Sequence, residues 1–191
     1  MIPWRDSQHS PGSGDYMNTK TGTCGIRAAQ CKIEDKSHVL KVLQDSARRF
    51  DTHIICFNAD MIAGRRHVEA AVWHAIRSFE AGEAISNTLE MEALLYAAGS
   101  RQCQVAASFG LHEGDNRLWV CCYPLRDEVW SSLEPDMQFL MGEAWMHIDD
   151  TKRERLMQLF EITPEELDSL QRADQIVDLV LERVALLRVA R

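Results

Sequence analysis

Two histidines are the first candidates for chemistry in this sequence. His67 and His74 lie seven residues apart in a stretch whose apolar spacing predicts a helix, with Glu69 between them. Zincins carry their two histidine ligands four residues apart in the pattern HExxH, which is absent here. The simpler interpretation places His67 in the first turn of the helix and packs His74 against its neighbours. A small hydrolase or metal enzyme built on the two histidines is the third of our three hypotheses.

The other reactive side chains form no recognisable catalytic set. Six cysteines lie mostly in apolar runs, outside any CxxC pair, which indicates small buried hydrophobes in a reducing compartment. A disulfide or a metal site is the alternative. The carboxylate pairs Asp149–Asp150 and Glu165–Glu166 stand at predicted helix starts, where they complement the helix dipole. We therefore predict a protein that is not an enzyme, with no catalytic residues, no metal site and no cofactor.

A set of polar residues at the ends of two predicted helices could bind a ligand. Arg101 and Gln102 begin a short helix, where side chains and free backbone N–H groups can face a ligand together. Tyr96, on the preceding helix, offers a ring for stacking and a hydroxyl group. The structural alternative is that Arg101 pairs with Glu90 or Glu92 and ties the two helices together.

The overall charge limits what this set can bind. The net charge of −8 argues against broad nucleic-acid binding, which needs a basic patch to neutralise phosphates. It leaves open the recognition of an unpaired RNA end by stacking and a few hydrogen bonds. Arg65 and Arg66 begin another predicted helix and could reach one phosphate.

The helices and strands that position these residues can be predicted from the spacing of apolar residues and from capping and turn residues. Residues 125–149 are ambiguous, because MQFLMGEAW suits a strand or a helix and only the turn at Glu134–Asp136 is clear. Ser37 and Thr163 are predicted helix caps, and Thr88 begins another helix. The predicted strands span 23–33, 53–57 and 117–123, and the predicted helices begin near 37, 65, 88, 101, 151, 164 and 175.

Length and composition indicate one domain. The chain has 191 residues, 46% hydrophobic and 26% charged, as is ordinary for a globular protein. Residues 1–18 are polar and rich in Ser, Gly and Pro, so we expect a disordered extension there and a single domain over 19–191. The sequence shows no membrane span and no signal peptide, and a cytoplasmic location is expected.

The last predicted helix, QIVDLVLERVALLRVAR, has charges that project in scattered directions. A helix that is apolar nearly all round is buried on most sides, or it has one face for its own core and another for a partner. We favour a partner for this helix, with burial in its own core as the alternative.

Several segments, in order, resemble one family. They are FNADMIAG, a helix with His and Ala at regular spacing, the pattern S-x-x-L-x-M-E-x-L-L-Y-A-x-G-x-R-Q, and the closing LVLERVALL. Together they resemble the small kinase-binding regulatory subunit of the KEOPS complex, the PRPK-binding protein family. The resemblance covers about residues 24–190.

The resemblance implies an α/β fold, a single compact domain with a small, largely antiparallel sheet flanked by several helices. It implies a non-catalytic role in threonylcarbamoylation of tRNA. The partners would be the small atypical kinase/ATPase of KEOPS, the 3′ CCA end of tRNA and, indirectly, other KEOPS subunits. A pure protein-interaction module without RNA binding is the second hypothesis.

The resemblance also assigns residues. The kinase-docking surface would be Val180, Leu181, Val184 and Leu187, so that Val184→Glu should abolish kinase binding without loss of the fold. The RNA site would be Ser86, Glu90, Tyr96, Arg101 and Gln102, with Arg65 and His67 as neighbours. Two residues depart from the family pattern: Cys103 replaces an aliphatic residue, and Asn87 stands where a basic residue is expected.

Overall fold

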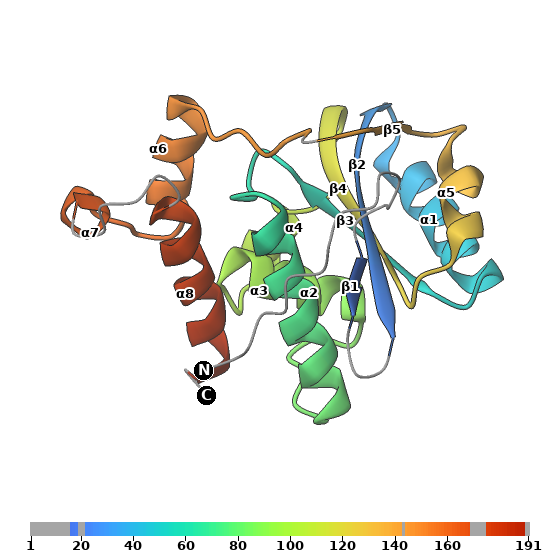
Figure 1. The fold of residues 1–191 in the computed structure, drawn as a ribbon. Helices are drawn as coiled ribbons and strands as arrows, with labels where there is room; N and C mark the ends of the chain where they lie inside the picture. The colour runs from blue at the N-terminus through green and yellow to red at the C-terminus, as the bar shows by residue number, and fades with distance from the viewer. Residues whose placement is uncertain (1–15, 19–21, 143, 169–174, 190–191) are drawn as a thin grey trace, which may run out of the picture.

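The computed structural model describes residues 16–18, 22–142, 144–168 and 175–189. Its strands form one antiparallel sheet in the order β1-β2-β4-β3, and β5 pairs with β2 beside β1 (Figure 1). The strands are β1 (Tyr16–Asn18), β2 (Thr23–Ile33), β3 (His53–Asn58), β4 (Gly114–Tyr123) and β5 (Gln138–Leu140). The helices are α1 (Lys36–Arg49), α2 (Arg65–Glu80), α3 (Leu89–Ala98), α4 (Cys103–Ala107), α5 (Asp127–Leu133), α6 (Asp150–Leu159), α7 (Pro164–Asp168) and α8 (Gln175–Val189).

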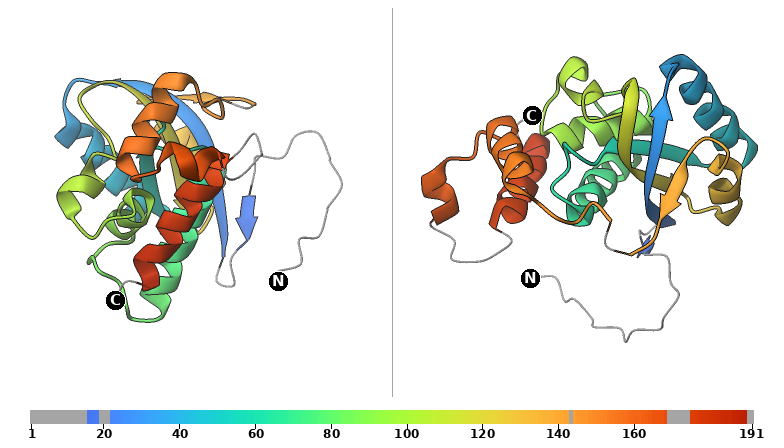
Figure 2. Two further views of the ribbon diagram at one scale, coloured as in Figure 1. Left: turned by 90° about the vertical axis from the view of Figure 1, so that its left-hand side faces the viewer. Right: turned by 90° about the horizontal axis from the view of Figure 1, so that it is seen from above.

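The two faces of the sheet carry separate layers of helices because strand residues alternate between faces. On β3, Ile55 and Phe57 pack in the core beneath α2, α3 and α8. Ile54 and Cys56 pack in the second core, beneath α1 and α5. Figures 1 and 2 show α8 next to α2, with α1 and α5 on the far side of the sheet. The predicted α/β fold with an antiparallel sheet is therefore confirmed.

Helix ends show why the chain folds locally as it does. Gly64 precedes α2 with φ +117°, a conformation that side-chain-bearing residues rarely adopt. Gly99 ends α3 in the left-handed conformation, with its N–H bonded to the carbonyls of Leu95 and Tyr96. Thr163 and Glu166 exchange side-chain-to-backbone hydrogen bonds and form a capping box.

Some sequence predictions need correction. Asp35, not Ser37, caps α1, because its carboxylate accepts hydrogen bonds from the N–H groups of Ser37 and His38. Tyr16–Asn18 form β1 at the edge of β2, although 1–18 was predicted to be disordered. The pairing supplies hydrogen bonds that the local sequence does not reveal; residues 1–15 lie outside the described part. The ambiguous 125–149 segment contains α5 and the strand β5.

Candidate functional site

The inner side of α8 belongs to the core of the chain itself. Val180, Val184 and Leu187 are buried in the cluster that joins α8 to α2 and α3, and Leu181 is partly buried beside them. Three of the four residues predicted to dock the kinase are therefore unavailable to a partner. Their spacing places them on one side of the helix, and that side closes the core. Because Val184 is fully buried in this core, we expect Val184→Glu to destabilise the fold and not to leave it intact.

The outward sides of α2 and α8 are exposed and partly apolar. Trp73 is 36% exposed, with the Arg77 guanidinium 4.5 Å from its ring centroid, and Leu186 on α8 is 46% exposed. An ion pair of 3.1 Å between Arg66 and Asp178 joins the two helices near their N-terminal ends. We name this surface the α2–α8 outer face, made up of Arg66, Ala70, Trp73, Arg77, Asp178, Leu181, Ala185 and Leu186.

Two residues of the predicted RNA site are buried. The hydroxyl of Tyr96 lies 2.6 Å from Ser78 Oγ, and its ring stacks on His74 with centroids 5.2 Å apart. His67 Nδ1 accepts the N–H of Ala63, and Nε2 lies 2.9 Å from the Ala97 carbonyl oxygen. Burial lowers the pKa of His67 to about 4, so the ring is neutral near pH 7. Both rings pack α2 against its neighbours, and neither can stack on a base.

Apart from Arg65, which begins α2, the remaining predicted RNA residues are divided between the two ends of α3. Ser86 precedes the helix, where its N–H donates to Glu92, while the exposed Arg101 and Gln102 follow its last residue. A helix of this length spans roughly 15 Å, so these residues do not form a single pocket. Glu90 faces β3 instead, with its carboxylate 2.8 Å from His53 Nδ1.

The structural alternative for Arg101 is not found either. In the described part of the chain, Arg101 makes no ion pair with Glu90 or Glu92. The Glu92 carboxylate accepts the N–H groups of Ile85 and Ser86, and Glu90 is paired with His53. The hydrogen bond to Glu90 raises the pKa of His53.

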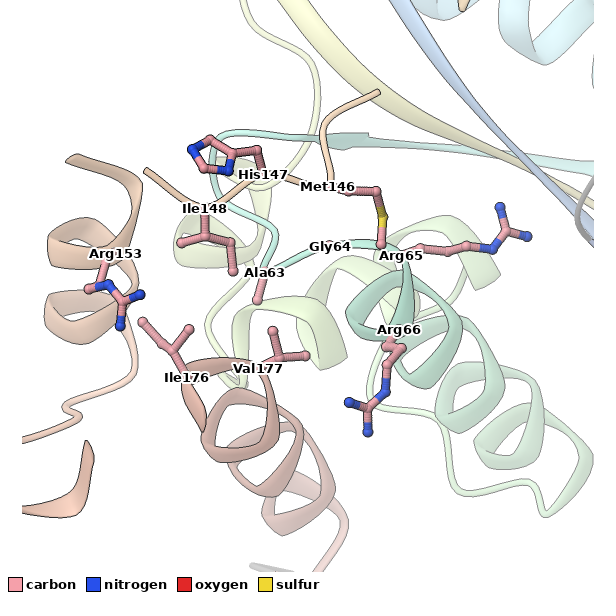
Figure 3. Close-up of a pocket in the computed structure, with 10 residues that line it drawn as sticks. All are labelled: Ala63, Gly64, Arg65, Arg66, Met146, His147, Ile148, Arg153, Ile176 and Val177. Carbon is pink, nitrogen blue, oxygen red and sulfur yellow. The ribbon is translucent and has the colours of Figure 1, made fainter. Parts of the chain in front are cut away.

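A cavity of about 300 Å³ lies where the N-terminal ends of α2 and α8 approach the segment before α6 (Figure 3). Apolar side chains cover part of its wall, and Arg66 and Arg153 stand at its margin. Its lining consists of Ala63, Gly64, Arg65, Arg66, Met146, His147, Ile148, Arg153, Ile176 and Val177.

The backbone adds positive potential to this cavity. Gly64 caps α2 without a side-chain hydrogen bond, so the positive end of the helix dipole faces this cavity. Arg65 lines the cavity, but its guanidinium turns away and bonds Glu69 at 2.9 Å and the Ile26 carbonyl at 3.2 Å. The combination of apolar wall, two arginines and helix end suits an anionic ligand with an apolar part.

The hypothesis of a metal enzyme gains no support from the two histidines. The ring nitrogens of His67 both meet backbone groups, which a metal would have to displace. Within the described ranges, no group of three or more His, Cys, Asp or Glu residues could hold a metal ion. Burial raises the pKa of Cys56 to about 12, so its thiol is a poor nucleophile.

Sequence reasoning missed both exposed features. Trp73 lies on the polar side of α2, at helical spacing from Arg66, Ala70 and Arg77. A large aromatic residue on that side could have indicated an exposed binding surface from the sequence alone. The cavity could not be read from the sequence, since Gly64, Arg153 and Val177 come from segments far apart along the chain.

The comparisons place the chain in a family. The family model described as kinase binding protein CGI-121 matches residues 31–188. The match covers well over half of the 191 residues, and the chain belongs to this kinase-binding family. No match is found among curated proteins. Of the described helices, none has the length and apolar content to cross a membrane.

Proposed function

We propose that this member of the kinase-binding family is a non-catalytic subunit of the KEOPS complex, which acts in the cytoplasm and supports threonylcarbamoylation of tRNA. It binds the small atypical kinase/ATPase through the α2–α8 outer face. The observation that carries this proposal is the exposed Trp73 on a helix whose other side is fully packed. The family match supports kinase binding, and the sequence resemblance supports the KEOPS assignment.

The chemistry of the outer face suits a protein partner. Tryptophan and arginine are the side chains that most often dominate the binding energy of protein interfaces. Here Trp73 lies beside Arg77, Arg66 lies two turns away on the same side of α2, and small residues such as Ala70 and Ala185 leave room for a partner to approach. The packed inner side fixes both helices, so little conformational entropy is lost when the partner binds.

The test compares charge introduced on the two sides of the sheet. Trp73→Glu and Ala185→Glu each place a carboxylate on the outer face, and Leu40→Glu on α1 is the matched control, since Leu40 is 39% exposed. We expect Trp73→Glu to weaken kinase affinity by at least about thirtyfold, the scale of a hot spot, while Leu40→Glu binds normally. Equal affinity of all three variants would refute docking at this face.

For RNA, we propose that the cavity at the N-terminal end of α2 receives the unpaired 3′ CCA end of tRNA. Arg66 and Arg153 would contact phosphates, and the apolar wall would hold a base. From the set predicted by resemblance, Arg65 lines this cavity, while Ser86, Arg101 and Gln102 would act only as outlying contacts. The net charge of −8 favours a few local contacts over a broad electrostatic surface.

The RNA proposal is tested with one tRNA transcript, with and without its terminal CCA, at near-physiological salt. We expect Arg153→Glu to remove the preference for the intact end. Arg101→Glu, which likewise reverses one charge, should weaken binding less and to the same extent for both forms. If only Arg101→Glu removes the preference, the site lies at the end of α3. If the unsubstituted chain has no preference, the alternative of a protein-interaction module without RNA binding is favoured.

A further inference from the structure

The free edge of the sheet is a feature that neither kinase binding nor RNA binding uses. β3 pairs with β4 on one side and ends the strand order on the other. An unpaired strand edge exposes backbone donors and acceptors, and proteins usually cover, twist or charge such an edge. On the far side of β3, a groove of about 880 Å³ separates α1 from α3.

The direction of the backbone groups on β3 follows from two hydrogen bonds. Ala59 N–H donates to the Arg117 carbonyl just beyond β4's paired region, whereas Asn58 N–H points the other way and donates to the Phe109 carbonyl. Because a strand alternates, Ile54 and Cys56 also direct their N–H and C=O groups away from β4. In the residues that the structure describes, no hydrogen bond to these outward groups is found.

These unpaired groups lie at residues that are themselves buried. Ile54 is 5% exposed and Cys56 is 7% exposed. A buried N–H or C=O group without a partner costs free energy that a matching donor or acceptor would recover. The outward groups of these two residues are spaced about 7 Å apart along β3, the repeat of an extended chain.

The walls of the groove are apolar and rise on both sides of this edge. Leu40 and Leu43 come from α1, and Met91 and Leu94 come from α3. In an added strand, alternate side chains would point to α1 and to α3, so both walls favour apolar residues. The groove is closed near Asn58 by the Phe109 carbonyl and near Thr52 by the bond from its hydroxyl to the Pro124 carbonyl at 2.6 Å.

We propose that this groove binds a short extended segment of a partner protein, apolar on both of its faces, which adds to β3 as a further strand. A helix satisfies its own backbone and would leave Ile54 and Cys56 unpaired. A second copy of the chain would have to bring its own α1 and α3 against the same walls, which stand on both faces of the edge. Strand addition uses main-chain hydrogen bonds for affinity and the side-chain walls for selectivity.

The probe is a peptide selected from a displayed library of random heptapeptides against the full chain. Its affinity is measured by fluorescence polarisation for the unsubstituted chain, for Leu40→Glu and Met91→Glu in the two walls, and for Trp73→Glu as the matched control on the outer face. We expect a loss of at least about tenfold for each wall variant, because a charge replaces an apolar contact, and no change for Trp73→Glu. Circular dichroism confirms that each variant is folded.

Backbone pairing is then tested directly on the peptide. N-methylation at every second residue should weaken binding about fivefold to tenfold per site, as expected for one lost hydrogen bond, while methylation of the intervening residues changes little. The amide protons of Ile54 and Cys56 should become protected from exchange. The proposal is overturned if no peptide is selected, if every methylation has the same effect, or if Leu40→Glu abolishes self-association of the chain instead of peptide binding. If Leu40→Glu loses peptide binding but binds the kinase with normal affinity, the peptide groove is distinct from the proposed kinase-docking face.

Discussion

The inner and outer sides of α2 and α8 differ in what they can do, although both carry apolar residues. On the inner side, Val180, Val184 and His67 are fully buried, and their neighbours belong to the same chain. On the outer side, Trp73 and Leu186 are more than one-third exposed. Hydrophobicity along a helix therefore does not identify the partner-binding side; packing of the other elements decides which side remains available.

The difference also separates stability from recognition. A substitution on the inner side acts on the folded state, because it changes the core. A substitution on the outer side leaves the core intact and acts on the partner. Substitutions on the two sides should therefore have different effects, on folding for the inner side and on partner binding for the outer side.

Val184→Glu should give the largest effect. It buries a carboxylate among the apolar residues between α8 and α2, which costs on the order of 5 kcal/mol of folding free energy. The neighbouring Ala185→Glu, on the exposed side of the same helix, should change stability by less than about 0.5 kcal/mol. Urea unfolding followed by circular dichroism measures both. Equal stability of the two variants would show that α8 does not pack as described.

His67 should make the inner side sensitive to acid. Its pKa is about 4 in the folded chain and about 6.5 in the unfolded chain, so the unfolded chain binds a proton first as the pH falls. The stabilisation of the folded state by the neutral ring is therefore complete above pH 6.5 and is lost as the pH falls toward 4. The loss approaches about 3 kcal/mol over this range. Urea unfolding at pH 7, 6, 5 and 4.5 should show this slope.

His67→Gln is the control for the acid effect, because glutamine keeps a donor and an acceptor but does not titrate. It should have a shallower dependence of unfolding free energy on pH between 6.5 and 4, whatever its stability at pH 7. The same slope in both proteins would assign the acid sensitivity to other groups.

Arg66→Ala should have the smallest effect on stability. The ion pair between Arg66 and Asp178 is about half exposed at both partners, and such pairs contribute roughly 0–1 kcal/mol. Its removal should shift the urea midpoint only slightly, and addition of salt should reduce the shift further. A loss comparable to that of Val184→Glu would mean that the outer side also holds the fold together.

Local signals allowed much of the fold to be predicted. β2 spans its predicted residues 23–33, and α2 begins at its predicted position, 65, directly after Gly64. α5 and β5 were missed or left ambiguous, since both are short and are fixed by contacts with α1 and β2. Short elements depend on tertiary contacts more than on propensity.

The candidate site was harder to predict than the fold. Tyr96 has the chemistry for stacking on a base, but the packing of α2 against α3 buries it beneath Ser78 and His74. Val184 has the chemistry for an interface, and the same layer of helices encloses it. Residue type indicates what a side chain can contact, whereas burial depends on segments distant in the sequence, such as α3 and α8.

Photo-crosslinking is the most direct test of the central claim, that the outer side of α2 and α8 is the kinase-binding surface. The photoreactive amino acid p-benzoylphenylalanine replaces Trp73 in one protein and Leu40 in another, and each is irradiated with the purified kinase. The account predicts a crosslink from position 73 and none from position 40, with peptide mapping placing the linked site on the kinase. A crosslink from position 40 and none from position 73 would contradict it and assign kinase binding to the opposite side of the sheet.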